Sequence, residues 1–407
     1  LSPLAAQKLS ELRAASQPRI ENRKSKVVLD GLLGIGAEGS PREPVATAIQ
    51  RIQSLRNDHN AFVVAADVPS GLNADTGEAG DPCVTADLTV TIGHCKTGLV
   101  ADAATNFVGR LALVELPELA TEEGDSASLI TPAMLRPLLP PRPFDSHKGT
   151  FGRVGIVAGS PGFLGAAKLC AEAALHAGAG LVTLYASPEI YNQLAPAVSP
   201  EIMVMPVRDY LTALNHRLDA VGIGPGLGLG SQNADSIREL VTRLRCPATV
   251  DADALNLLAR TPLAWQRMDG PRLFTPHPVE MARLFRESMD LQRRPTAEQY
   301  VSKHAITLLL KGARTIIAER KRPLLYNTTG NPGMGSGGMG DVLTGVCAAL
   351  MGAKRTPREA AMLGAWLCGR AAELSVFAPG GSPESLTATD VIRNLGAAFR
   401  ELRGTTG

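Results

Sequence analysis

The segment Gly330–Leu343 (GNPGMGSGGMGDVL) has the strongest chemical signature in the chain, because six of its first eleven residues are glycine and an aspartate follows them. It leads into Val342–Met351 (VLTGVCAALM), an apolar pattern that predicts a helix. Backbone N–H groups at a helix start can bind phosphate oxygens. A carboxylate beside bound phosphate is unfavourable unless it accepts a proton from an attacking hydroxyl, so we predict that Asp341 is a general base in phosphoryl transfer.

Other chemically suggestive segments follow apolar strand patterns in the second half of the chain. They are Ser146–Gly152 (SHKGTFG), Pro161–Ala167 (PGFLGAA), Gly222–Gly230 (GIGPGLGLG), Asp251–Leu258 (DADALNLL), Thr275–Glu280 (TPHPVE) and Lys311–Thr315 (KGART). Each alone has a purely structural explanation, such as a tight turn or a structural histidine. Because ligands bind at the carboxyl ends of strands in open α/β sheets, their joint occurrence predicts one site.

The elements that position these segments alternate between short apolar runs and helical patterns. The predicted strands are Lys26–Asp30, Ala61–Asp67, Leu88–Ile92, Arg153–Ala158, Leu181–Tyr185, Ala220–Ile223, Ala248–Asp251 and Ile306–Leu310, with a further one possible at Leu111–Leu116. Continuous apolar strands indicate parallel sheets covered on both faces. We therefore predict an α/β protein with a doubly wound sheet in its second half and a partial Rossmann-like α/β domain before it.

Composition narrows the function classes. The chain of 407 residues has 44% hydrophobic and 20% charged residues and a net charge of +2, which is typical of a globular protein with two domains. It shows no basic surface for nucleic acid and no apolar run of membrane-spanning length. The six cysteines are widely spaced, so we expect reduced thiols and a cytoplasmic location.

A change of composition marks the domain boundary. The stretch 118–145 begins with acidic residues and serine and ends in the proline-rich LRPLLPPRPFD, which cannot continue a helix or a central strand. We place the boundary near residues 120–130, which divides the chain into domains 1–125 and 126–407.

The second half resembles the ADP-dependent NAD(P)H-hydrate dehydratases, a branch of the ribokinase-like fold. The matching motifs are HKGTFGRVGIVAGS, GAA, GPGLG, DADALN, TPHPVEM, LLKGART and NPGMGSGGMGDVLTG. The resemblance implies repair of hydrated NADH and NADPH, in which ADP or ATP, with Mg²⁺, phosphorylates the ring hydroxyl and loss of phosphate regenerates the cofactor. It makes Asp341 the base and assigns substrate contacts to Ala166, Gly226 and His277. It assigns the adenine nucleotide to Lys311, Gly312, Ala313, Arg314, Thr315 and Gly340.

The first half has acids and a hydroxyl at neighbouring predicted strand ends. Asp30 and Asp67 each end a strand, and Ser70 follows Asp67 closely, so they could bind a ribose or a cation or simply stabilise turns. The segments resemble the NAD(P)H-hydrate epimerase domain. That resemblance implies K⁺ ligands at Asp30 and Ser70, a substrate contact at Asp67 and a basic position at Lys96. It implies a phosphate cradle formed by Gly34, Ile35, Gly36, Ala37, Glu38, Gly39 and Ser40.

The resemblance is incomplete, since the family's first portion, with an Asn-Asn-Gly-Gly-Asp-type loop, has no counterpart before Lys26. We therefore expect dehydratase activity without epimerase activity, and we expect a homo-oligomer. Two alternatives remain open: an ATP-dependent sugar or vitamin kinase of the same fold, and a non-catalytic nucleotide-binding protein. The kinase would not need TPHPVEM and KGART beside the glycine-rich segment. A pure binding site would gain by losing Asp341.

Overall fold

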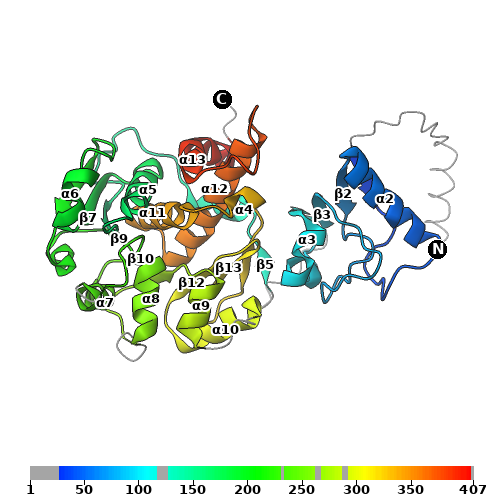
Figure 1. The fold of residues 1–407 in the computed structure, drawn as a ribbon, viewed down its shortest axis with the longest axis horizontal. Coiled ribbons are helices and arrows are strands. Elements are labelled where there is room, and N and C mark those ends of the chain that lie inside the picture. The colour runs from blue at the N-terminus through cyan, green and yellow to red at the C-terminus, as the bar shows by residue number, and fades with distance from the viewer. Residues whose placement is uncertain (1–26, 117–126, 231–232, 262–266, 287–291, 405–407) are drawn as a thin grey trace.

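The computed structural model describes residues 27–116, 127–230, 233–261, 267–286 and 292–404. It has two sheets, and the smaller one belongs to the N-terminal part of the chain (Figure 1). Most of the predicted boundary segment lies outside the described residues, so the division at 125/126 stays a prediction. Among the described helices, none has the length and apolarity needed to cross a bilayer.

The first domain contains a parallel four-stranded sheet. Its strands, in spatial order, are β1 (Val27–Asp30), β2 (Phe62–Ala66), β3 (Leu88–Ile92) and β4 (Arg110–Val114). The helix α2 (Val45–His59) packs Ile49 and Ile52 against Val63 and Ala65 of β2. Between β3 and β4 lie two 3₁₀ turns, η1 (Thr97–Val100) and η2 (Asp102–Ala104), and the short helix α3 (Thr105–Val108).

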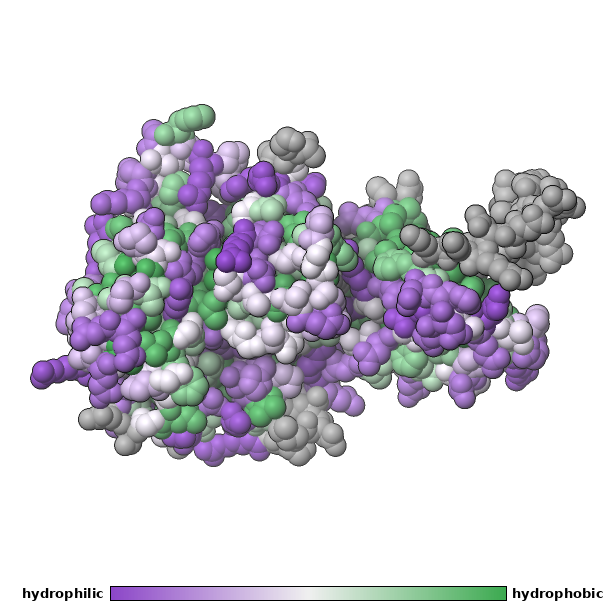
Figure 2. All heavy atoms as spheres, turned by 45° about the horizontal axis from the view of Figure 1, so that its top comes forward, coloured by the Kyte–Doolittle hydropathy of each residue, from purple (hydrophilic) through white to green (hydrophobic). Residues whose placement is uncertain are grey.

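One face of this small sheet exposes apolar side chains. Val27 is 60% exposed, Leu29 is 70% exposed and Phe62 is 46% exposed. Figure 2 shows apolar residues at the surface of this smaller body. The apolar cluster between α2 and this sheet is correspondingly small.

The second domain is built on a ten-stranded sheet. Its spatial order is β5 (Ser128–Leu129), β14 (Leu325–Asn327), β13 (Thr315–Glu319), β12 (Thr307–Leu310), β11 (Arg272–Phe274), β10 (Ala248–Val250), β9 (Ala220–Ile223), β6 (Arg153–Val157), β7 (Leu181–Ala186) and β8 (Ile202–Pro206). From β12 to β8 all neighbours are parallel. The pairs β12–β13 and β13–β14 are antiparallel. The expected doubly wound sheet is present, with an antiparallel extension that the sequence patterns did not predict.

Helices cover both faces of this sheet. The first layer contains α5 (Leu164–His176), α11 (Met339–Gly352), α12 (Pro357–Phe377) and α13 (Ala388–Arg403). The second contains α7 (Ala234–Arg243), α8 (Ala252–Arg260), α9 (Pro278–Phe285) and α10 (Arg293–Lys303). Two further helices, α4 (Pro132–Leu135) and α6 (Pro188–Leu194), and the 3₁₀ turns η4 (Arg136–Leu138), η5 (Tyr210–Asn215) and η6 (Pro332–Met334) complete the domain.

Successive residues of β12 show how the two layers form. Leu308 and Leu310 pack with the second layer, whereas Leu309 packs with the first, as the alternation of a strand requires. The second apolar core also includes Leu99, Val108 and Leu111 of the first domain. The two domains therefore share buried apolar surface.

Candidate active site

A buried ion pair joins two strand ends of the large sheet. Asp251 follows β10 and is 1% exposed, and its Oδ1 accepts a hydrogen bond of 2.8 Å from Nζ of Lys311, which follows β12. The other oxygen, Oδ2, accepts a bond of 2.9 Å from the hydroxyl of Thr344 in α11. The pair thus ties the start of α11 to the carboxyl edge of the sheet.

Asp341 lies in the first turn of α11, beside this pair. Burial raises the pKa of its carboxyl to about 7, and the nearby Asp251 adds to the rise while Lys311 opposes it. A base with a pKa near neutrality combines a useful ionised fraction with good proton affinity. The environment of Asp341 therefore suits proton abstraction at physiological pH.

The glycine-rich segment brings bare backbone to the same place. Gly338 caps α11 with φ +89°, and a Cβ there would lie 2.6 Å from Cδ1 of Leu169. A Cβ on Gly340 would lie 3.3 Å from both Oδ2 of Asp251 and Nζ of Lys311. No side chain caps this helix start, so its first N–H groups can bind an anion.

His277 is the N-cap of α9 and faces the same edge. Its Nδ1 accepts hydrogen bonds from the backbone N–H groups of Val279 (3.1 Å) and Glu280 (3.4 Å). The backbone N–H of His277 donates to Oε2 of Glu280 (2.9 Å). Burial, and then the charge of Lys311, lower the pKa of His277. The imidazole is therefore neutral near pH 7, and its Nε2 lies 3.5 Å from Oε1 of Glu280.

Glu280 was not singled out by sequence reasoning as a site residue, yet it belongs to this cluster. It is 5% exposed, and its Oε2 lies 3.8 Å from Nζ of Lys311. Burial raises the pKa of Glu280, although Lys311 opposes the rise. The spacing of Glu280 three residues after His277, typical of a capping box, is the sequence signal that could have identified it.

The predicted substrate positions Ala166 and Gly226 lie against each other. Gly226 has φ +60°, and a Cβ there would lie 3.0 Å from Cβ of Ala166 and 2.8 Å from Cβ of Phe163. The loop is held by Ser160, whose hydroxyl donates to the Gly226 carbonyl (2.8 Å), and by Asp253, which accepts from the N–H of Gly228 (2.9 Å). The charge of Asp253 also raises the pKa of Asp341, so the loop and Asp341 share one edge.

In the segment Lys311–Thr315 the middle of the turn is exposed, whereas the following arginine side chain is buried. Gly312 and Ala313 are exposed, whereas Arg314 is 4% exposed and donates to the carbonyl of Gly109 in the first domain. Thr315 donates to the Gly312 carbonyl (3.0 Å). The side chain of Arg314 therefore serves the contact between the domains, and Lys311 and exposed backbone are what this segment presents at the sheet edge.

In the first domain the structure brings Asp30 and Ser70 together. The Ser70 hydroxyl donates to Oδ1 of Asp30 (2.6 Å) and its N–H donates to Oδ2 (2.8 Å), with both residues buried. Within the described residues, no group of three or more His, Cys, Asp or Glu is arranged to hold a metal ion. Asp30 and Ser70 thus offer a pair of oxygen ligands rather than a closed cage.

Asp67 and Lys96 form an ion pair at the next strand ends. Burial of Asp67 acts to raise its pKa, but hydrogen bonds from Lys96 and from the N–H of Ile92 bring it below its usual value. The predicted phosphate cradle, Gly34–Ser40, forms a turn after β1. Its last residue contacts the loop between β2 and β3, where the Ser40 hydroxyl accepts a hydrogen bond from the N–H of Asp81 (3.2 Å).

The chain matches two family models in order along its length. Residues 4–98 match the model of the YjeF-related protein N-terminus, and residues 154–394 match the model of NAD(P)H-hydrate dehydratase. A curated bifunctional NAD(P)H-hydrate repair enzyme from Moorella thermoacetica is 40% identical over 365 residues, covering 85% of this chain and 68% of the relative. The chain belongs to the family of bifunctional NAD(P)H-hydrate repair enzymes. The match to the first model begins at residue 4 of this chain, and the expectation that the family's first loop has no counterpart here stays a prediction.

Other members and solved structures agree with this assignment. The Escherichia coli repair enzyme is 37% identical over 377 residues, covering 91% of this chain and 70% of the relative. The ADP/ATP-dependent NAD(P)H-hydrate dehydratase of Bacillus subtilis, co-crystallised with ATP/Mg²⁺, matches with a TM-score of 0.60 and 28% identity over 67% of this chain and 98% of its own. A ribokinase-like superfamily protein from Enterococcus faecalis matches with a TM-score of 0.62, 26% identity and coverage of 70% and 100%. The predicted ribokinase-like fold is confirmed.

Proposed function

We propose that this chain repairs hydrated NADH and NADPH by ADP-dependent dehydration of the S epimers. The ring hydroxyl attacks the β-phosphorus of ADP, so that a new O–P bond forms, the bond to AMP breaks and the hydroxyl proton passes to a base. Loss of phosphate from the ring carbon and of a proton from the neighbouring carbon then restores the double bond. The products are the reduced cofactor, AMP and inorganic phosphate.

The observation that carries this proposal is the half-buried Asp341 at a glycine-rich helix start. Its pKa of about 7 suits abstraction of a hydroxyl proton, and the bare N–H groups of Gly338–Gly340 lie next to it. A site that only bound phosphate would be weakened by that carboxylate. This argues against a non-catalytic nucleotide-binding protein, and the family relationship does not favour a sugar or vitamin kinase.

The surrounding residues have complementary roles in this reaction. Lys311, held by Asp251 and close to Glu280, places a positive charge beside the loop and can neutralise the transferring phosphoryl group. His277 can donate from Nε2 to the hydrated nicotinamide nucleotide, and the Ala166–Gly226 contact provides a close-packed wall for it. Asp251 keeps Lys311 charged, since its proximity raises the pKa of that lysine although burial opposes the rise.

Mg²⁺ fits this site as an ion held chiefly by nucleotide phosphates and water. Both oxygens of Asp251 are already hydrogen-bonded, and the described residues form no closed cage, which matches the usual preference of Mg²⁺ for phosphates plus one or two carboxylates. When bound, Mg²⁺ would supply charge neutralisation on the phosphates. For the first domain we propose K⁺ at Asp30 and Ser70, whose paired oxygens are hard ligands.

The test is an assay that follows the absorbance of regenerated NADH with ADP, Mg²⁺ and hydrated NADH supplied. Turnover with release of AMP supports the proposal, whereas ADP binding without turnover would support the non-catalytic alternative. Supplying the R epimer alone, with ADP in excess, tests the expectation of no epimerase activity, and adding K⁺ tests the cation assignment. We place the activity in the cytoplasm, since the six cysteines are free thiols and four of them are buried.

A further inference from the structure

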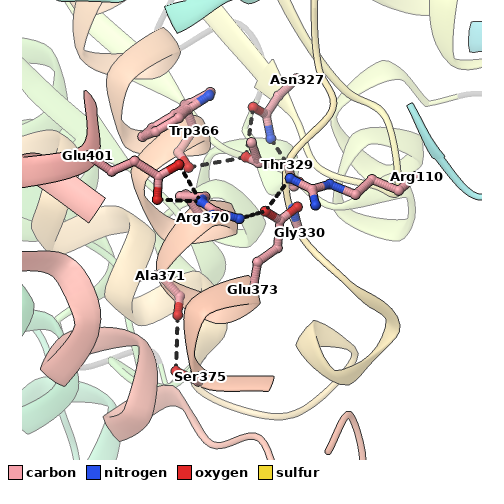
Figure 3. Close-up of polar contacts among 10 residues, drawn as sticks. All are labelled: Arg110, Asn327, Thr329, Gly330, Trp366, Arg370, Ala371, Glu373, Ser375 and Glu401. Carbon is pink, nitrogen blue, oxygen red and sulfur yellow. Dashed lines mark hydrogen bonds and ion pairs between the residues drawn. The ribbon is translucent and has the colours of Figure 1, made fainter. Parts of the chain in front are cut away.

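A buried carboxylate connects the first domain to the beginning of the glycine-rich segment. Glu373, near the end of α12, has a side chain that is 1% exposed and three polar partners (Figure 3). Its Oε1 accepts from the N–H of Gly330 at 3.1 Å. Its Oε2 accepts from Nη1 of Arg370 at 2.7 Å and from Nη2 of Arg110 at 2.9 Å. Arg110 is the first residue of β4, so a side chain of the other domain completes the cluster.

The segment that enters the glycine-rich loop is held by α12. Thr329 donates from its hydroxyl to the Trp366 carbonyl at 3.1 Å, and Asn327 donates to the Ala365 carbonyl at 3.4 Å. Gly330 then turns with φ +117°, a conformation that suits glycine alone. The hydrogen bond from Gly330 to Glu373 fixes the direction of the chain at the first residue of the loop. Figure 3 shows Glu373 between Arg110 and Arg370, directly beside Gly330.

The charges in this cluster depend on one another. A buried carboxylate is stable only when its charge is well compensated, and here two guanidinium groups share Oε2. Arg370 is also held by Glu401 of α13 at 2.9 Å, so it is oriented by the second domain. Arg110 is therefore the partner that the first domain contributes, and its loss leaves Glu373 with a single cation.

A second polar contact between the domains supports the segment Lys311–Thr315, to which the adenine nucleotide is also assigned. Asp102 of the first domain accepts from Nε of Arg293 at 2.7 Å, and Nη1 of Arg293 donates to the Arg314 carbonyl at 3.0 Å. A Cβ on Gly312 would lie 2.1 Å from that same Nη1, so Arg293 packs directly under the exposed turn. Residues 102–110 thus contact the supports of both segments to which the adenine nucleotide is assigned.

We propose that Arg110 and Glu373 are positioning residues for nucleotide binding, through which the first domain holds the glycine-rich loop in its binding geometry. They act on Gly330 and through it on the loop backbone, and Asp102 acts in parallel on Lys311–Thr315. The proposal rests on the proposed function, because it presumes that the adenine nucleotide binds at these two segments.

The experiment compares Arg110→Ala with wild type by the NADH assay and by calorimetry with MgADP, using the full chain. We expect the KM and the Kd for ADP to rise by about five- to tenfold, with kcat within about twofold, because the reacting groups are untouched. Arg110→Lys should recover part of the loss, since it restores the positive charge, although on one compact ammonium nitrogen in place of the planar guanidinium. Asp102→Ala should raise the same constants independently.

The matched control is Arg56→Ala. Arg56 pairs with Asp87 within the first domain at 2.8 Å, and its side chain is 34% exposed, against 41% for Arg110. We expect the control to bind ADP as wild type does. Equal effects of Arg56→Ala and Arg110→Ala would overturn the proposal in favour of general weakening of the first domain.

Two further outcomes distinguish failure of the positioning role from failure of the proposed function. An active wild type with unchanged ADP constants in Arg110→Ala would refute the positioning role and leave the proposed function intact. A wild type that neither binds ADP nor turns over would refute the proposed function, and the positioning role would fall with it. Glu373→Gln, which keeps an acceptor for Gly330 but removes the charge, should fall between wild type and Glu373→Ala in ADP affinity.

Discussion

Replacing Asp341 by asparagine should lower turnover by orders of magnitude and at the same time stabilise the fold. Asp341 has an ordinary pKa of 3.8 and a pKa of about 7 in the folded protein, because burial and the charge of Asp251 disfavour its ionised form. The folded state therefore binds this proton more tightly than the unfolded chain, and stability falls as pH rises from about 4 to about 7. Asparagine has the same shape without the charge, so the variant escapes this loss.

The size of the effect follows from the shift. A rise of about three pKa units corresponds to at most about 4 kcal/mol of folding free energy above pH 7. At pH 5, only about one unit above the ordinary pKa, the same argument yields about 1.6 kcal/mol. The stabilisation by Asp341→Asn should thus be larger at pH 8 than at pH 5. Turnover should fall by about 10²- to 10⁴-fold, the usual contribution of a general base.

Urea denaturation at pH 5 and pH 8 measures the first effect, and the NADH assay measures the second. The control is Asp145→Asn, the same chemical change at an exposed position of the second domain, which should alter neither stability nor turnover. A destabilised Asp341→Asn protein at pH 8 would refute the burial argument. Near-normal turnover in that variant would refute the assignment of Asp341 as the base.

The kcat of the wild type should rise with pH through about 7, because Asp341 must lose its proton to act as the base. Asp251→Asn should move this limb to lower pH, by about one unit, since it removes a charge that raises the pKa; an unmoved limb in pH-rate profiles would contradict the coupling. Gly340→Val should weaken ADP binding about tenfold or more in calorimetry, because its Cβ lies 3.3 Å from Lys311 Nζ in the space next to the phosphates. Light scattering should find the homo-oligomer implied by the family resemblance, and a monomer at micromolar concentration would refute it.

Most of the parallel strands with apolar runs were predicted, but β8, β11 and the antiparallel β13 and β14 were not. Leu181–Ala186 and Ala220–Ile223 lie where their patterns place them, because a buried parallel strand needs apolar residues on both faces. The strand β11 has only three residues, and one of them is Arg272, a buried arginine that donates to the carbonyls of Val241 and Leu244. A strand that contains a charged residue is hard to recognise from sequence, because the carbonyls that hydrogen-bond to that residue lie far away along the chain.

In the candidate site, too, local features could be predicted from the sequence and long-range contacts could not. Asp341 and Gly338 were identifiable because glycine conformation and the start of a helix are local properties, determined by neighbours within one turn. The shift in the pKa of Asp341 was not, since it arises from burial and from Asp251, ninety residues earlier in the chain. Glu280 was overlooked for the same reason, because its proximity to Lys311 exists only once β11 pairs with β12 and brings both residues to one edge of the sheet.

By itself, the sequence determined most of the parallel strands, the glycine-rich loop at a helix start and the acid in that helix's first turn, because periodicity, glycine content and helix starts are encoded over a few residues. Only the tertiary structure decided how the charges are paired. Asp251 meets Lys311, and Glu373 meets both Arg370 and Arg110 of the other domain. Electrostatic energies depend on distance and burial rather than on separation along the chain, so these partners and their pKa shifts appear only once strand ends and helices are assembled.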